Sequence, residues 1–155
     1  MVVNFEAEWS KANSTVNDWL FYAGYEAEDC RNDSGGENQN HIREWVVPND
    51  HTNVYITLAR SDERIDAQVY APLCTVSKED KKLQLYTEIL NLNATTLSCC
   101  AFGLEEGNKI VVIADRGAMD FTLFDLDEMM HNVKRVASEY CSEFIKRYEA
   151  QRVDS

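Results

Sequence analysis

A helix-forming stretch with two apolar stripes, at residues 77–93, constrains the fold of this chain more than any other feature. Ser77 can accept backbone N–H groups at its start, and Asn93 suits the left-handed position that often follows a helix. At about 100° per residue, one stripe consists of Leu83, Tyr86 and Leu90 and the other of Leu85, Ile89 and Leu92. A helix that covers one core face needs a single stripe. We therefore expect burial on two sides, by another helix of the same chain or by the same helix of a second chain.

Residues that alternate between apolar and polar predict strands on both sides of this helix. Before it, residues 45–47, 54–58 and 65–70 predict an antiparallel three-stranded meander, which Pro72 is expected to end. After it, residues 97–102 and 109–114 predict a hairpin with its turn at residues 105–108. The second arm of this hairpin is a continuous apolar run, which is typical of a central strand covered on both faces.

The two ends of the chain predict helices with one apolar stripe each. The first covers residues 5–23. The last begins near Asp125, which can cap it, and is expected to run past Tyr148. Residues 31–40 are polar and are expected to form a mobile loop, and residues 151–155 are expected to fray. The order is α-β-β-β-α-β-β-α. It predicts one α+β domain over residues 1–155, with a single antiparallel sheet and helices packed mainly on one face.

The charge of the chain excludes some partners. Fifteen Lys and Arg stand against twenty-seven Asp and Glu, for a net charge of −12. Such a chain repels phosphate backbones and anionic lipids, so we expect no nucleic-acid or membrane partner. The N-terminal residues lack the pattern of a signal peptide. The five cysteines show no disulfide spacing and are expected to be reduced, so a cytoplasmic location is predicted.

Residues with catalytic or metal-binding spacing are not found, and we predict no catalytic site, no metal and no cofactor. Cys99 and Cys100 fall on a predicted strand, where neighbours point to opposite faces, so they cannot form a joint redox or zinc clamp and are expected to be buried. A thiol enzyme that uses either of them, for example Cys100 with His131, stays a separate hypothesis, because such partners meet only in the fold.

Three segments resemble the type III secretion chaperone-like superfamily, and within it the YbjN-type bacterial sensory-transduction-regulator group. They are the helix end at residues 89–93, the strand at residues 109–114, and residues 124–130, which open the long last helix. The resemblance implies a small, acidic, cytosolic homodimer that is joined through the middle helix and a neighbouring strand. It also implies a chaperone-like or regulatory function without catalysis, in which an extended partner segment is held on hydrophobic patches or a sheet edge.

These considerations give two functional hypotheses. The first is a dimeric binding protein for a protein partner of unknown identity, with the dimer contact at Leu85, Ile89 and Leu92. The alternative is a small-ligand sensor with a pocket between the sheet and the C-terminal helix. The residues that we assign to the partner or ligand surface are Val54, Ile56, Leu58, Met129 and Met130.

Overall fold

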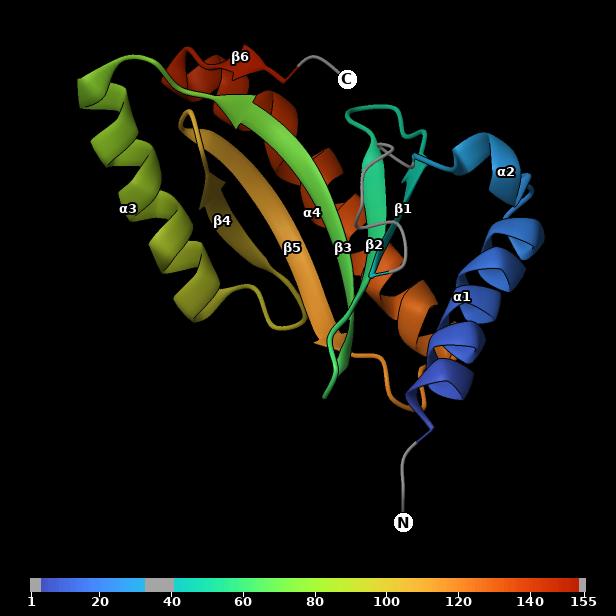
Figure 1. Cartoon of the computed structure of the whole chain (residues 1–155). Coiled ribbons are helices and arrows are strands. Elements are labelled where there is room, and N and C mark those ends of the chain that lie inside the picture. Colours follow the sequence, from blue (N-terminus) through green and yellow to red (C-terminus); the bar gives the residue numbers. More distant parts are fainter. Residues whose placement is uncertain (1–3, 33–40, 154–155) are drawn as a thin grey trace.

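The computed structural model describes residues 4–32 and 41–153, and its elements follow the predicted order (Figure 1). The short helix α2 and the short strand β6 are added to that order. The elements are α1 (Phe5–Tyr22), α2 (Ala27–Cys30), β1 (Ile42–Val47), β2 (Val54–Arg60), β3 (Ile65–Thr75), α3 (Glu79–Thr95), β4 (Ala101–Glu105), β5 (Lys109–Gly117), α4 (Leu123–Tyr148) and β6 (Gln151–Arg152). The predicted loop at residues 31–40 lies, beyond residue 32, outside the described residues.

The strands form one antiparallel sheet in the order β1-β2-β3-β5-β4, and β6 pairs with the end of β3. The predicted meander is confirmed. So is the central position of β5, whose residues Ile110, Val111 and Val112 are all buried. The expectation that Pro72 ends the third strand is wrong. β3 continues to Thr75 with a register shift just after the proline, because a residue without an N–H can be accommodated at an irregularity in the ladder.

The helices pack on one face of the sheet. α4 contacts β2, β3 and β5, and α1 contacts α4, β2 and β3. The core between them contains large, fully buried side chains such as Trp45, Leu20, Leu126 and Phe144. α3 contacts α4 and β4, and Figure 1 shows it at the opposite end of the sheet from α1. The exposed sides of α1 and α3 therefore lie at different ends of the sheet and form separate surfaces.

Two helices start at positions other than the predicted ones, and hydrogen bonds of a capping box explain one of these shifts. The N-cap of α4 is Thr122, three residues before Asp125. The hydroxyl of Thr122 accepts the N–H of Asp125, and the carboxylate of Asp125 accepts the N–H of Thr122. This capping box uses Asp125 as the third helical residue rather than as the cap. α3 begins at Glu79 after Lys78, so the predicted cap at Ser77 is wrong. α4 ends at Tyr148 and does not run past it. The expected fraying of residues 151–155 is wrong for Gln151 and Arg152, which form β6 and pair with β3, and residues 154–155 lie outside the described residues.

Candidate functional site

The two apolar stripes of α3 have opposite environments. Leu85 and Ile89 are buried inside the same chain, with 0% and 5% of their surface exposed, and Leu92 is half-buried. Leu83 and Leu90 are 72% and 67% exposed. The prediction that Leu85, Ile89 and Leu92 form the stripe available to a second chain is therefore corrected: that stripe faces the core. The other stripe faces outward at Leu83 and Leu90, whereas its third member, Tyr86, is half-buried against the core. A dimer contact at α3 stays a prediction, now for the stripe of Leu83 and Leu90.

Contacts with the end of α4 fix this rotation of α3. Glu88 lies on the same side of the helix as Leu85 and Leu92, since it is three residues after the first and four before the second. Its carboxylate accepts hydrogen bonds from the Arg147 guanidinium at 2.7 Å and from the Tyr148 hydroxyl. Because the side of α3 that carries Glu88 is turned toward α4, Leu83 and Leu90 on the other side face away from it.

The sheet edge beside α3 is partly covered by a side chain. The amide of Asn93 donates to the carbonyl of Phe102 at 2.9 Å and accepts the N–H of Phe102 at 2.7 Å. Asn93 thus satisfies the outward backbone groups of Phe102 as a residue of a further strand would. Leu104, two residues on, is 53% exposed. The hydroxyl of Tyr86 donates to Asn108 beyond the other end of β4, so Leu90 of α3 and Leu104 of β4 each stand between these two contacts along the chain. We use the name α3 surface for the exposed leucines of α3 and β4, namely Leu83, Leu90 and Leu104.

The edge at β1 also carries a cover. The N–H of Asn32 donates to the carbonyl of Glu44 at 3.0 Å, and Arg31 forms a bridge with Trp45. Both edges of the sheet are therefore occupied in part by the chain itself. Addition of a long partner strand would have to displace one of these covers.

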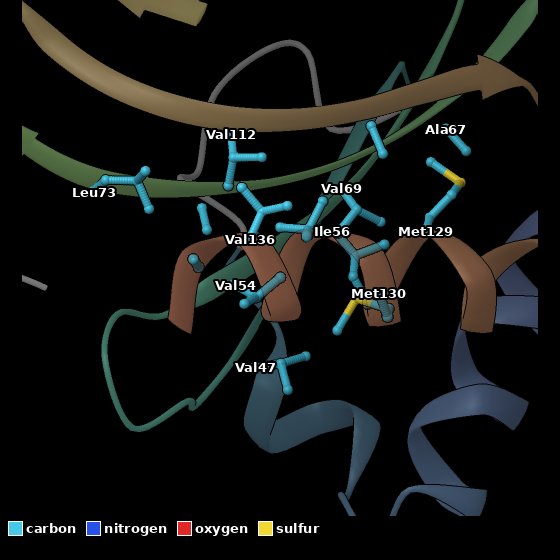
Figure 2. Close-up of a cluster of buried hydrophobic side chains, with 14 of the residues drawn as sticks. Val47, Val54, Ile56, Ala67, Val69, Leu73, Val112, Met129, Met130 and Val136 are labelled. Carbon is cyan, nitrogen blue, oxygen red and sulfur yellow. The ribbon is translucent and has the colours of Figure 1, made fainter. Parts of the chain in front are cut away.

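The residues assigned to a partner or ligand surface lie in the core. Val54, Ile56 and Leu58 are 0% exposed, and Met129 and Met130 are 6% and 1% exposed. Figure 2 shows the labelled members of this group between the sheet and α4, among Val47, Val69 and Val136. The inward face of β2 and the apolar face of α4 cover each other, so these residues are not available as a surface.

A third feature, which the sequence reasoning missed, is an aromatic surface where α1 ends and α4 begins. Phe21, Tyr22 and Phe124 are 72%, 76% and 74% exposed. The rings of Phe21 and Tyr22 meet edge to face, with their centroids 5.8 Å apart. An open hollow of about 360 Å³ lies here, and its lining consists of Trp19, Tyr22, Ala23, Leu123, Phe124 and Asp127. The position of Phe21, Tyr22 and Phe124 outside the buried stripes of α1 and α4 is a sequence signal that each of these residues is exposed, but it does not show that they meet in one surface.

Neither Cys74 nor Cys100 is activated as a nucleophile by its surroundings. Cys99 is exposed and Cys100 half-buried, so the expected burial of both is wrong: residues 97–100 precede β4 instead of forming part of it. Burial raises the pKa of Cys100, and it raises the pKa of Cys74 to about 12. A raised pKa keeps a thiol protonated near neutral pH, which is the opposite of what catalysis by a thiolate requires.

A hollow of about 320 Å³ lies between the end of β5 and α4. Met129 lines it together with Cys99, Asp115, Arg116, Glu128 and Asn132, so its wall is mostly polar. Within residues 4–32 and 41–153, no group of three or more His, Cys, Asp or Glu side chains is placed to hold a metal ion. No helix in the same ranges is long and apolar enough to cross a membrane.

Comparisons with known proteins identify the fold. Protein-family models and curated proteins give no match to this chain. Solved structures do: the ExsC–ExsE complex matches at 18% identity and a TM-score of 0.58, over 86% of this chain and 92% of that one. The fold is that of the type III secretion chaperones.

Two further structures agree with this assignment. The Yersinia pestis type III secretion chaperone SycH, solved in complex with a stable fragment of YscM2, matches at 16% identity and a TM-score of 0.53, over 83% of this chain and 98% of that one. The HopA1–SchA chaperone–effector complex matches at 12% identity and a TM-score of 0.56, over 91% of this chain and 99% of that one. At these identities the likeness concerns the fold.

Proposed function

We propose that this chain is a non-enzymatic, cytoplasmic binding protein, chaperone-like or regulatory, that acts as a homodimer and holds a segment of a protein partner. The observation that carries the proposal is the exposed Leu83 and Leu90 stripe on a helix whose other stripe is already buried. The similar solved structures, which are complexes with protein partners, support a function in protein binding. We propose a single domain over residues 1–155, nearest to the YbjN-type regulators among proteins of this fold.

The α3 surface suits a symmetric contact between two copies. In a twofold dimer the same patch meets itself, so Leu83 and Leu90 of each copy would face the α3 helix of the other. Leu104 would extend this contact onto the adjoining strand. Because Asn93 already bonds to Phe102, we propose that side chains of α3, rather than pairing of the two β4 edges, provide most of the contact.

The α1–α4 end would stay free in such a dimer. Figure 1 shows α1 and α3 at opposite ends of the sheet, so a contact at α3 does not cover the aromatic residues of α1. Each copy would then present one aromatic surface to a partner. In this arrangement the protein could bind a partner segment without breaking its dimer contact.

The test of this function begins with the mass in solution. Light scattering at micromolar concentration should give the mass of two chains of 17.8 kDa each. A mass of one chain would refute the dimer. The alternative, a small-ligand sensor, is favoured only by the polar hollow that Met129 lines. A thermal-shift screen with small metabolites tests it, because a ligand that binds the folded state must raise its melting temperature.

A further inference from the structure

The aromatic surface at the α1–α4 end combines an apolar floor with an acidic rim. The floor is formed by Trp19, Tyr22, Leu123 and Phe124, around the open hollow. Asp127 stands at its wall, where its Oδ1 accepts a hydrogen bond from Nε1 of Trp19 at 3.0 Å. This bond holds the carboxylate in place, and its second oxygen can accept from a group that enters the hollow.

More carboxylates than ammonium groups surround this hollow. Asp18 is four residues before Tyr22 on α1, so it lies on the same helix face as this aromatic neighbour. Asp18 is exposed. Lys134 is the cation that the structure places against the site, with its Nζ 5.5 Å from the centroid of the Trp19 ring. Two carboxylates, Asp18 and Asp127, therefore stand beside the aromatic floor together with one ammonium group.

We infer that this hollow binds a segment of the protein partner in which a large aromatic or aliphatic side chain stands next to Arg or Lys. The apolar side chain enters between Tyr22 and Phe124, and the cation meets Asp127. The inference rests on the proposed function, since it names the partner chemistry that the chain selects. It adds a binding site that is separate from the α3 surface.

The charges on the rim distinguish this occupant from two others. A second copy of the chain would bring the same carboxylates to the contact, and like charges that face each other weaken association. A membrane surface with anionic lipids would be repelled by the same rim and by the net charge of −12. A basic and apolar segment is attracted by both the floor and the rim.

The site can be tested with peptides selected by the full chain. A display library of random peptides of about twelve residues is panned on the immobilised protein and then depleted on the Phe124→Ser variant. We expect the remaining sequences to carry an aromatic or large aliphatic residue beside Arg or Lys. No enrichment, or enrichment of acidic sequences, would overturn the inference.

A selected peptide, labelled with fluorescein, then gives affinities by anisotropy. We expect Phe124→Ser and Tyr22→Ser each to weaken binding by about tenfold or more, since central aromatic residues dominate such contacts. Asp127→Asn keeps the hydrogen bond to Trp19 but removes the charge, so it should weaken binding and reduce its dependence on salt. Ile42→Ser, at an exposed apolar residue of β1, is the matched control and should leave the affinity unchanged.

Two further measurements separate the other outcomes. A mass above two chains that falls to two chains in Phe124→Ser would assign the surface to a second copy and overturn the inference. Sedimentation of the chain with vesicles of phosphatidylserine and phosphatidylcholine, lost in Phe124→Ser, would assign it to membranes and overturn it too. Peptide binding that depends on Phe124 in a protein of one-chain mass would support this site while refuting the proposed dimer.

Discussion

Replacement of the exposed leucines of α3 by aspartate should separate two copies of the chain without unfolding either. Leu83 and Leu90 are 72% and 67% exposed, so an aspartate at either position is solvated in the separate chain. In the proposed twofold contact the same aspartate is removed from water and faces the apolar stripe of the other copy. The substitution should therefore weaken the dimer while the separate chain keeps its fold.

The exposed fractions set the size of this effect. Full burial of a leucine side chain stabilises by about 1.5–3 kcal/mol, so burial of the remaining two thirds or so of Leu83 or Leu90 should contribute about 1–2 kcal/mol. Each residue occurs twice in a twofold contact, which gives about 2–4 kcal/mol per substitution. This alone raises the dissociation constant roughly 30- to 700-fold. Burial of an unpaired carboxylate from each copy weakens the contact further.

Sedimentation equilibrium over a concentration series measures the dissociation constants of the wild type, Leu83→Asp and Leu90→Asp. Urea unfolding, followed by circular dichroism, checks that the separate chains keep their fold. Leu85→Ala is the matched control on the same helix. Because Leu85 is fully buried within its own chain, its loss should lower the free energy of unfolding by about 2–5 kcal/mol. If both aspartate variants dimerise as tightly as the wild type, the assignment of the α3 surface is refuted.

Three further predictions concern hydrogen bonds, pH and thiols. Asn93→Ala should lower the free energy of unfolding by about 1–3 kcal/mol in urea titrations, because two backbone groups at the β4 edge lose their partner; an equal loss in Asn91→Ala, an exposed position on the same helix, would contradict this. The hydrogen bond from the Thr122 hydroxyl, with smaller contributions from other groups, lowers the pKa of Asp125 below its usual value of about 3.9. Its carboxylate therefore stabilises the fold above that value and ceases to do so as the pH falls through the lowered pKa. The difference in the free energy of unfolding between wild type and Asp125→Asn should thus shrink in acid. A difference that grows in acid would contradict the stabilising effect of the ionised carboxylate. Cys99 is the exposed thiol and should react first with a thiol reagent at neutral pH, and Cys99→Ser should remove that fast phase; a fast phase that persists would show that another thiol is accessible.

The order of elements and the alternation along the strands could be predicted because they depend on local periodicity. The alternation in β2 and β3 and the continuous apolar run of β5 each specify a strand and its environment before any partner strand is known. The exact limits could not be predicted. Whether Thr122 or Asp125 caps α4 depends on which side chain reaches a free N–H, and both types are good caps. The continuation of β3 past Pro72 depends on its pairing with β5, which is remote in sequence.

The aromatic surface shows a different limit. The stripes of α1 and α4 were sufficient to predict which residues enter the core, and Trp19 and Leu126 do so. Phe21, Tyr22 and Phe124 lie outside those stripes, and each alone is an unremarkable exposed residue. They become a surface only because the end of α1 meets the beginning of α4, a contact between residues about a hundred positions apart. Periodicity within one helix contains no information on such a contact.

The orientation of α3 shows why the sequence could not select the exposed stripe. Both stripes hold three large apolar residues, so the helix alone does not distinguish them. Glu88 lies beside Leu85 and Leu92, and a carboxylate in that position would ordinarily indicate the solvent side. Its partners Arg147 and Tyr148 lie about sixty residues away and turn that side toward α4 instead. Glu88→Gln, which keeps the size of the side chain but removes its charge, should therefore weaken this contact and loosen α3, which faster hydrogen exchange of the α3 amides would detect. Unchanged exchange in this variant would mean that Leu85 and Ile89 fix the rotation by their burial alone.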